Sequence, residues 1–181
     1  MDSMLAWCFK VANLRLILGM CAIYLVFPLL LLPQVINSGS VGPLDLLLWY
    51  NHDTLYQMLS AYGEAIRTRY IMGLLTVDLA YPIYYGTLLS MIMAVIIKKL
   101  TIPCPQKIIL IPYIVVLFDL TENGFLIFLL SAYPKQHNHI ADTVGFITAI
   151  KWSIFFSVAV LLIYLVGRGL HHRKKSQSGN N

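Results

Sequence analysis

Two carboxylates and a carboxamide interrupt a long apolar run from Ile108 to Ala132, namely Asp119, Glu122 and Asn123. A run of this length predicts a helix that crosses a membrane. A charged side chain at the centre of such a helix costs about 3 kcal/mol, so we expect both acids to face the protein interior and to mark a functional site. Carboxyl groups held away from water act as general acids or bases, so Asp119 and Glu122 are the candidate catalytic residues.

Two other apolar runs carry ionisable side chains at a similar depth. At 1.5 Å per helical residue, Asp78 and Lys151 lie about 12 Å from the outer ends of their runs, and Glu122 about 16 Å from the outer end of its own. A shared depth is what pairing between helices requires. Because one lysine cannot neutralise three acids, we expect Lys151 to pair with Asp78 or Glu122, and at least one other carboxyl to hold a proton near neutral pH.

Helical spacing places polar and aromatic side chains next to these ionisable groups. Polar and aromatic side chains that share one face of each helix predict a pocket for a lipid or another apolar small molecule, whether or not the protein chemically changes that molecule. Pro82 should release the backbone carbonyl of Asp78 and widen the interior there. The alternative is a structural or accessory subunit, whose buried charges serve helix packing or a partner helix without catalysis. The predicted ligand-binding residues are Asp78, Tyr81, Tyr85, Asn123, Lys151 and Trp152.

The composition excludes most soluble classes of protein. Hydrophobic residues make up 59% of the chain and charged residues 12%, whereas about 25% of the residues of a soluble domain are charged. Lysines and arginines cluster beside the apolar runs, where they orient a membrane protein, so we expect no nucleic-acid partner. Neither His137 and His139 nor His171 and His172 have a spacing that puts two imidazoles on one helix face. The sequence therefore predicts no metal, and with no nucleotide or dinucleotide fingerprint it predicts no cofactor.

We predict an all-α fold, a polytopic integral membrane protein with a bundle of four transmembrane helices. A length of 181 residues allows about four spans and their loops. The expected partners are membrane lipids and the apolar ligand, with a second copy of the chain or another membrane protein as a further alternative. A single domain covers residues 1–170, with spans of about 16–36, 71–97, 108–132 and 143–167, followed by a disordered basic cytoplasmic tail over 171–181.

The flanks of the apolar runs predict their orientation. Basic residues precede the first run, separate the second from the third and follow the fourth, whereas the other two connections are acidic or balanced. Both termini should therefore be cytoplasmic in a multi-pass protein of the cell membrane, such as a bacterial inner membrane. Alternatively, the first run is a signal peptide cleaved near Ser38-Gly39-Ser40, which would leave three spans.

The connection between the first two spans is long and not hydrophilic. Leu55, Met58, Leu59 and Tyr62 have helical spacing, and Gly63 is placed to end that helix. We expect the segment 43–63 to contain an amphipathic helix on the outer leaflet or, alternatively, a lid over the bundle. After it, Arg67 and Arg69 could hold a lipid phosphate through their guanidinium groups, or extend to the headgroup level without a specific partner.

One combination of residues resembles a group of small uncharacterised bacterial four-span membrane proteins, over about 43–166, and this resemblance implies no activity. A weaker resemblance is to the EXPERA superfamily, which includes the emopamil-binding sterol isomerases and implies a cavity for a sterol-like amine or carbocation. The His and Glu pair of that superfamily has no counterpart in 16–32, and Lys151 stands where it has Asn. The residues that carry the first resemblance are Gly63, Arg69-Tyr70, Asp78, Tyr81-Pro82, Asp119-x-x-Glu122-Asn123, Tyr133-Pro134 and Lys151-Trp152.

Overall fold

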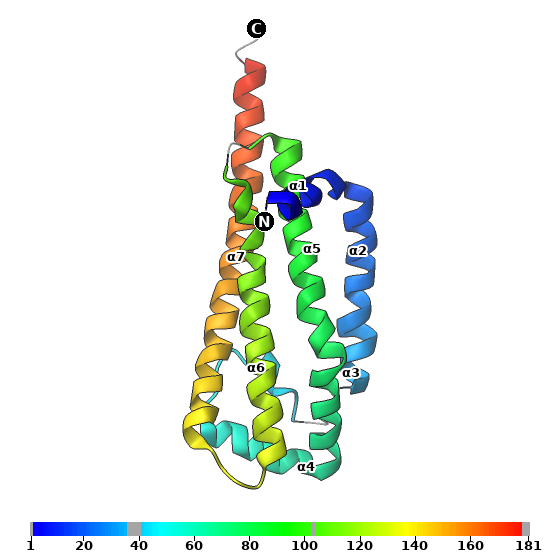
Figure 1. Cartoon of the computed structure of the whole chain (residues 1–181). Coiled ribbons are helices and arrows are strands. Elements are labelled where there is room, and N and C mark those ends of the chain that lie inside the picture. Colours follow the sequence, from blue (N-terminus) through cyan, green and yellow to red (C-terminus); the bar gives the residue numbers. More distant parts are fainter. Residues whose placement is uncertain (1, 36–40, 103, 179–181) are drawn as a thin grey trace.

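The computed structural model describes residues 2–35, 41–102 and 104–178, and the secondary structure of this part is entirely helical. Four of its helical stretches are long and apolar enough to cross a membrane: Leu14–Leu31, His52–Leu100, Gln106–Ala132 and Asn138–His171. They pack as a bundle in which α5 contacts α2, α6 and α7 (Figure 1). The main helices are α1 (Asp2–Val11), α2 (Leu14–Val26), α3 (Leu32–Val35), α4 (His52–Leu75), α5 (Val77–Leu100), α6 (Pro112–Ala132) and α7 (Asn138–Ser178), with short turns η1 (Phe27–Leu31), η2 (Leu44–Leu46) and η3 (Gln106–Leu110).

The first span is a helix with a wide turn in it. The side chain of Asn13 caps α2 by accepting a hydrogen bond from the backbone N–H of Leu16 at 2.9 Å. Pro28 has no backbone N–H to donate to the carbonyl of Tyr24. At this point the helix widens into the π-turn η1, in which the N–H of Leu32 donates to the carbonyl of Phe27. The helix is described as far as Val35, so the end of the expected span and Ser38-Gly39-Ser40 lie outside the described residues.

The connection between the first two spans contains the first part of the helix α4, which begins at His52. Asn51 caps the start of α4 by accepting from the N–H of Thr54 at 3.0 Å. Gly63 was expected to end this helix; it instead interrupts it, with a φ of 69° in a region that other residues avoid, and α4 resumes beyond it as far as Leu75. The apolar residues with helical spacing before it are buried against the bundle. Its place at a membrane surface stays a prediction.

One close approach joins this connection to α7. Gly145 lies against the backbone of Tyr50, and a Cβ at position 145 would overlap the Tyr50 carbonyl. Next to it, the backbone N–H of His52 donates to Asp142 Oδ1 at 2.8 Å, and the ring Nδ1 lies 2.9 Å from the same oxygen. The start of α4 is therefore held tightly to the start of α7.

The C-terminal segment differs from our expectation. We predicted a disordered tail over 171–181, but α7 continues as a helix to Ser178. A helix that is already nucleated extends at little cost through residues such as lysine, arginine and glutamine, which favour helical structure. The C-terminal part of α7 extends beyond the rest of the bundle (Figure 1).

Candidate functional site

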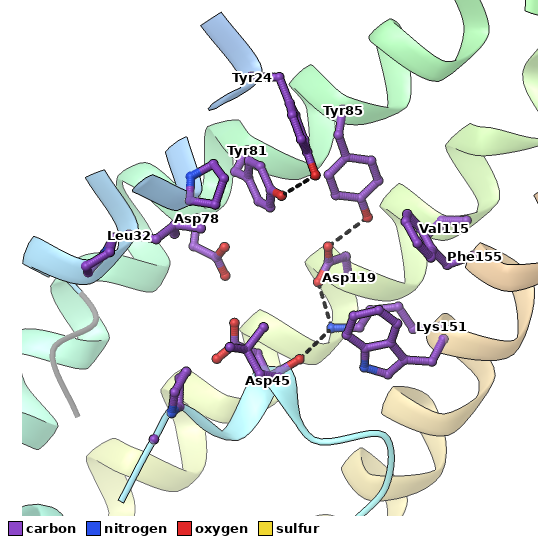
Figure 2. A pocket seen from close by; sticks show the side chains of 16 residues that line it. Tyr24, Leu32, Asp45, Asp78, Tyr81, Tyr85, Val115, Asp119, Lys151 and Phe155 are labelled. Carbon is purple, nitrogen blue, oxygen red and sulfur yellow. Dashed lines mark hydrogen bonds and ion pairs between the residues drawn. The ribbon is translucent and has the colours of Figure 1, made fainter. Parts of the chain in front are cut away.

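A cavity of about 560 Å³ lies among α2, α5, α6 and α7 (Figure 2). Aromatic and aliphatic side chains form most of its wall, and carboxyl groups are concentrated on one part of it. It therefore combines an apolar volume with a polar end. The lining residues are Tyr24, Pro28, Leu32, Pro33, Gly42, Pro43, Asp45, Leu46, Asp78, Tyr81, Tyr85, Val115, Asp119, Lys151, Trp152 and Phe155.

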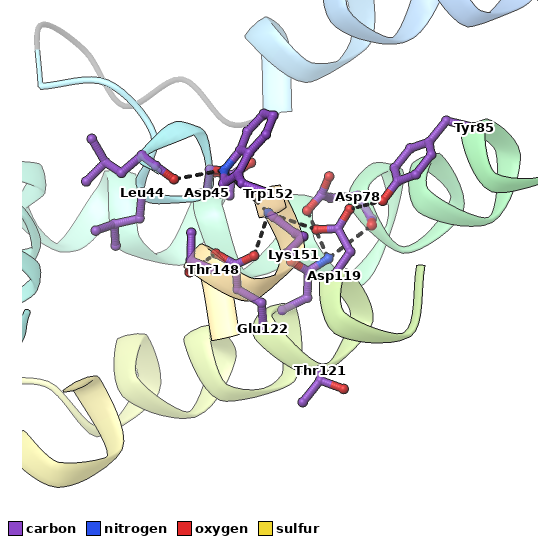
Figure 3. A network of polar contacts seen from close by, with 12 residues as sticks. Leu44, Asp45, Asp78, Tyr85, Asp119, Thr121, Glu122, Thr148, Lys151 and Trp152 are labelled. Atoms are coloured by element: carbon purple, nitrogen blue, oxygen red, sulfur yellow. Dashed lines mark hydrogen bonds and ion pairs between the residues drawn. The ribbon is translucent and has the colours of Figure 1, made fainter. Parts of the chain in front are cut away.

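Lys151 on α7 is the positive centre of the polar end, and it is 6% exposed. Its Nζ lies 2.5 Å from Glu122 Oε2 and 3.1 Å from Asp119 Oδ1 (Figure 3). The hydroxyl of Thr148 donates to the other Glu122 oxygen, Oε1, at 2.7 Å. Lys151 is thus paired with both acids of α6, and its expected alternative partner, Asp78, is not among its contacts.

Asp119 has partners on both of its carboxylate oxygens. Oδ1 faces Lys151, and Oδ2 accepts a hydrogen bond from the hydroxyl of Tyr85 on α5 at 2.8 Å. Farther along the same wall, the hydroxyl of Tyr81 donates to the hydroxyl of Tyr24 at 3.0 Å. Asp119 is therefore locked into a network that links α5, α6 and α7.

Asp78 on α5 is held by Asn123 rather than by a cation. The Asn123 Nδ2 donates to Asp78 Oδ2 at 2.9 Å and to the Asp78 backbone carbonyl at 3.1 Å. That carbonyl would normally accept from residue 82, which is proline and has no N–H. A single carboxamide on α6 thus satisfies both the backbone group that Pro82 releases and one carboxylate oxygen.

Asp45 is a residue of the site that sequence reasoning missed. It lies in the connection after the first span, and the hydroxyl of Tyr70 on α4 donates a short hydrogen bond to its Oδ1. Burial raises the pKa of the Asp45 carboxyl, although the Tyr70 hydroxyl and the charge of Lys151 act in the opposite direction. Counting depth along helices could not find Asp45, because it is in a loop that folds back into the bundle. The apolar residues around it were the available signal.

The residues 42–47, here called the strap, hold Asp45 against the cavity. The hydroxyl of Tyr62 donates to the carbonyl of Gly42 at 2.7 Å, and the indole N–H of Trp152 donates to the carbonyl of Leu47 at 2.9 Å. Lys151 Nζ also lies 3.4 Å from the carbonyl of Asp45. Side chains of α4 and α7 therefore satisfy the strap's backbone, as a loop buried in a bundle requires.

The predicted site residues fall into two groups. Of the candidate catalytic residues, Asp119 lines the cavity, but Glu122 is completely buried behind Lys151. Of the predicted ligand-binding residues, Asn123 is likewise buried and absent from the wall. The members that line the cavity are Asp78, Tyr81, Tyr85, Lys151 and Trp152.

The two arginines proposed for lipid phosphate lie apart from the cavity. Arg67 donates to the carbonyl of Leu59 at 2.7 Å, and its guanidinium lies 4.2 Å from the ring centre of Tyr133. It thus supports the break at Gly63, while Arg69 is exposed. Across the described ranges, no group of three or more histidine, cysteine, aspartate or glutamate side chains could hold a metal ion.

Comparisons with models of protein families, with curated proteins and with solved structures find no match for this chain.

Proposed function

We propose that this chain is a multi-pass protein of the cell membrane whose cavity binds a lipid or another apolar small molecule. The cavity among α2, α5, α6 and α7 carries this proposal, because its volume of about 560 Å³ falls within the roughly 300–1,000 Å³ typical of ligand sites. A wall that is mostly apolar, with a few convergent polar groups at one end, suits a ligand with a large apolar body and a small polar head.

The free hydrogen-bonding capacity of the wall restricts that head. Lys151 and Asp119 use their polar atoms on one another and on Glu122 and Tyr85. Trp152 uses its N–H on the strap. What remains toward the cavity is carboxyl oxygen, which accepts hydrogen bonds and repels anions, together with the hydroxyl of Tyr24, which accepts from Tyr81 and keeps its own hydrogen. We therefore expect a head that donates hydrogen bonds and has no negative charge.

The arrangement of the spans favours entry from the side. The first span packs on α5, and α2 has only Ile17 buried. Tyr24 and Pro28 on this span and Phe155 on α7 line the same cavity. A ligand dissolved in the membrane would thus enter between the first span and α7, while the strap covers another side.

Filling the cavity without touching its charges tests this function. Val115 lines the cavity and is 1% exposed, whereas its neighbour Ile114 is 45% exposed on α6. We expect native mass spectrometry of the purified wild type to show a specifically bound lipid or small molecule, which Val115→Phe loses and the control Ile114→Phe keeps. Thermal unfolding of all three proteins verifies that each is folded.

The alternative, a purely structural role, has one observation in its favour. Lys151 finds both of its carboxylate partners within the chain, on α6, so the charges can hold helices together without a ligand. If the wild type carries no specific species, or if Val115→Phe retains it, the binding function is wrong and helix packing is the better account.

A further inference from the structure

The charges around the cavity do not balance. Lys151 contributes one positive charge and contacts two acids, Asp119 and Glu122. If both acids are ionised, their combined charge of two already exceeds the single charge of Lys151. Asp45 and Asp78 add two more carboxyl groups to the wall, and no salt bridge joins either of them to a cation within the described ranges.

Asp78 is buried and only partly satisfied. It is 4% exposed, and Asn123 donates to its Oδ2. Its Oδ1 has no hydrogen-bond donor among the residues that the structure describes. Figure 2 shows the carboxyl groups of Asp45 and Asp78 directed into the same part of the cavity. Within the described ranges, an oxygen of a buried acid that has no hydrogen-bond donor thus points into the part of the cavity that a second acid also lines.

Of the described groups that surround this pair, none adds a positive charge to that of Lys151. Tyr70 on α4 contributes a hydroxyl, which is already donated to Asp45. Tyr81 and Tyr85 on α5 contribute hydroxyls donated elsewhere, to Tyr24 of α2 and to Asp119 of α6. From α7, Lys151 reaches only the backbone carbonyl of Asp45. Two ionised carboxylates that line the same apolar cavity repel each other, and sharing one proton removes this repulsion.

We propose that Asp45 and Asp78 hold one proton between them at neutral pH, and that this acid pair is the proton donor and acceptor of the cavity. This assignment replaces Asp119 and Glu122, the two acids that are paired with Lys151. Its use on a ligand rests on the proposed function. In that step the O–H bond of the shared proton breaks, the proton moves to a basic atom of the ligand's head, and both Asp45 and Asp78 remain as carboxylates beside the newly charged head.

Infrared spectroscopy of the full-length protein in detergent at pH 7 tests the pair without any ligand. A protonated carboxyl has a carbonyl stretching band that an ionised carboxylate lacks. We expect this band in the wild type, its loss or a clear change in both Asp45→Asn and Asp78→Asn, and its retention in Asp119→Asn and Glu122→Gln. Absence of the band from the wild type overturns the proposal, as does loss of the band in Asp119→Asn or Glu122→Gln.

A milder variant covers the case in which either aspartate variant does not fold. Tyr70→Phe keeps every carboxyl group but removes the hydroxyl that donates to Asp45, so the band should shift in frequency; an unchanged band argues against Asp45 as a member of the pair. The two proposals fail separately. A wild type with the band but without a bound species keeps the acid pair and loses the binding function, and the reverse result loses only the pair.

Discussion

At the scale of single residues, Lys151 is the group on which the polar end depends. Among the residues that the structure describes, it is the one ammonium that contacts the carboxylates lining or backing the cavity, and it is 6% exposed. Removing one partner of a buried ion pair leaves the other charges uncompensated, which costs far more than the pair contributes when it is intact. The consequence is a strong asymmetry between breaking the network and neutralising it.

We predict that Lys151→Met lowers the free energy of unfolding by about 3–5 kcal/mol. The triple variant that also carries Asp119→Asn and Glu122→Gln should recover part of this loss, because the acids are then neutral. Unfolding in mixed detergent micelles measures both values. If the triple variant is no more stable than Lys151→Met, charge compensation is not the role of this lysine.

Sequence reasoning predicted part of this network. A shared depth on three helices correctly suggested that Lys151 meets an acid of α6, and Pro82 correctly pointed to the free carbonyl of Asp78. The sequence could not tell which acid pairs with Lys151, because this depends on how the packed helices are rotated and how closely they approach. Counting residues does not determine either property. Asp45 was missed since only the folded strap brings it into the bundle.

At the scale of elements, the contact between Tyr50 and Gly145 sets how closely the connection after the first span approaches α7. Because a Cβ at position 145 would overlap the Tyr50 carbonyl, backbone rather than a flexible side chain would have to move. This approach also positions the neighbouring strap, whose Leu47 carbonyl accepts from Trp152 on the same helix.

We predict that Gly145→Ala lowers the free energy of unfolding by about 1–3 kcal/mol, as overpacked sites do. Gly124→Ala on α6 is the matched control. It meets no atom within 4 Å, so it should be neutral or should stabilise the helix by up to about 1 kcal/mol. Thermal unfolding in detergent compares the two. Equal effects of both substitutions would show that the Tyr50 contact does not constrain α7.

The helices themselves were largely readable from the sequence. Apolar runs located the four long helical stretches, and the preference of glycine for a positive φ located the break at Gly63. The predicted span 71–97 is not one helix, because α4 ends before Thr76 and α5 begins after it. The π-turn at Pro28 and the continuation of α7 to Ser178 were not predicted. Both depend on how an existing helix accommodates a local disturbance, since it can widen by one residue or extend past its apolar part.

At the scale of the whole molecule, the positions of the basic residues predict one orientation in a membrane. The connection that contains α4 and the one that contains η3 lie at opposite ends of the bundle (Figure 1). If Gln106–Leu110 faces the cytoplasm, as Lys98, Lys99 and Lys107 indicate, then α4 lies outside.

We predict that single cysteines at Ser60 and Gln106 are labelled from opposite sides of the membrane. Both positions are exposed, and the host chain should have its three native cysteines replaced by alanine. In intact cells a membrane-impermeant maleimide should label Ser60→Cys, whereas Gln106→Cys should react only after permeabilisation. Labelling of both from the same side contradicts the four-span topology.

The sparse burial of the first span bears on how the protein is made. With only Ile17 of α2 buried and no Asp, Glu, Lys, Arg or His between Leu16 and Val35, this helix could reside in lipid alone while the rest of the chain is still being synthesised. The helix α6 could not reside there alone, because Asp119 and Glu122 pair with Lys151 on α7, which is synthesised later. Release of α6 from the insertion machinery should therefore be delayed until α7 arrives.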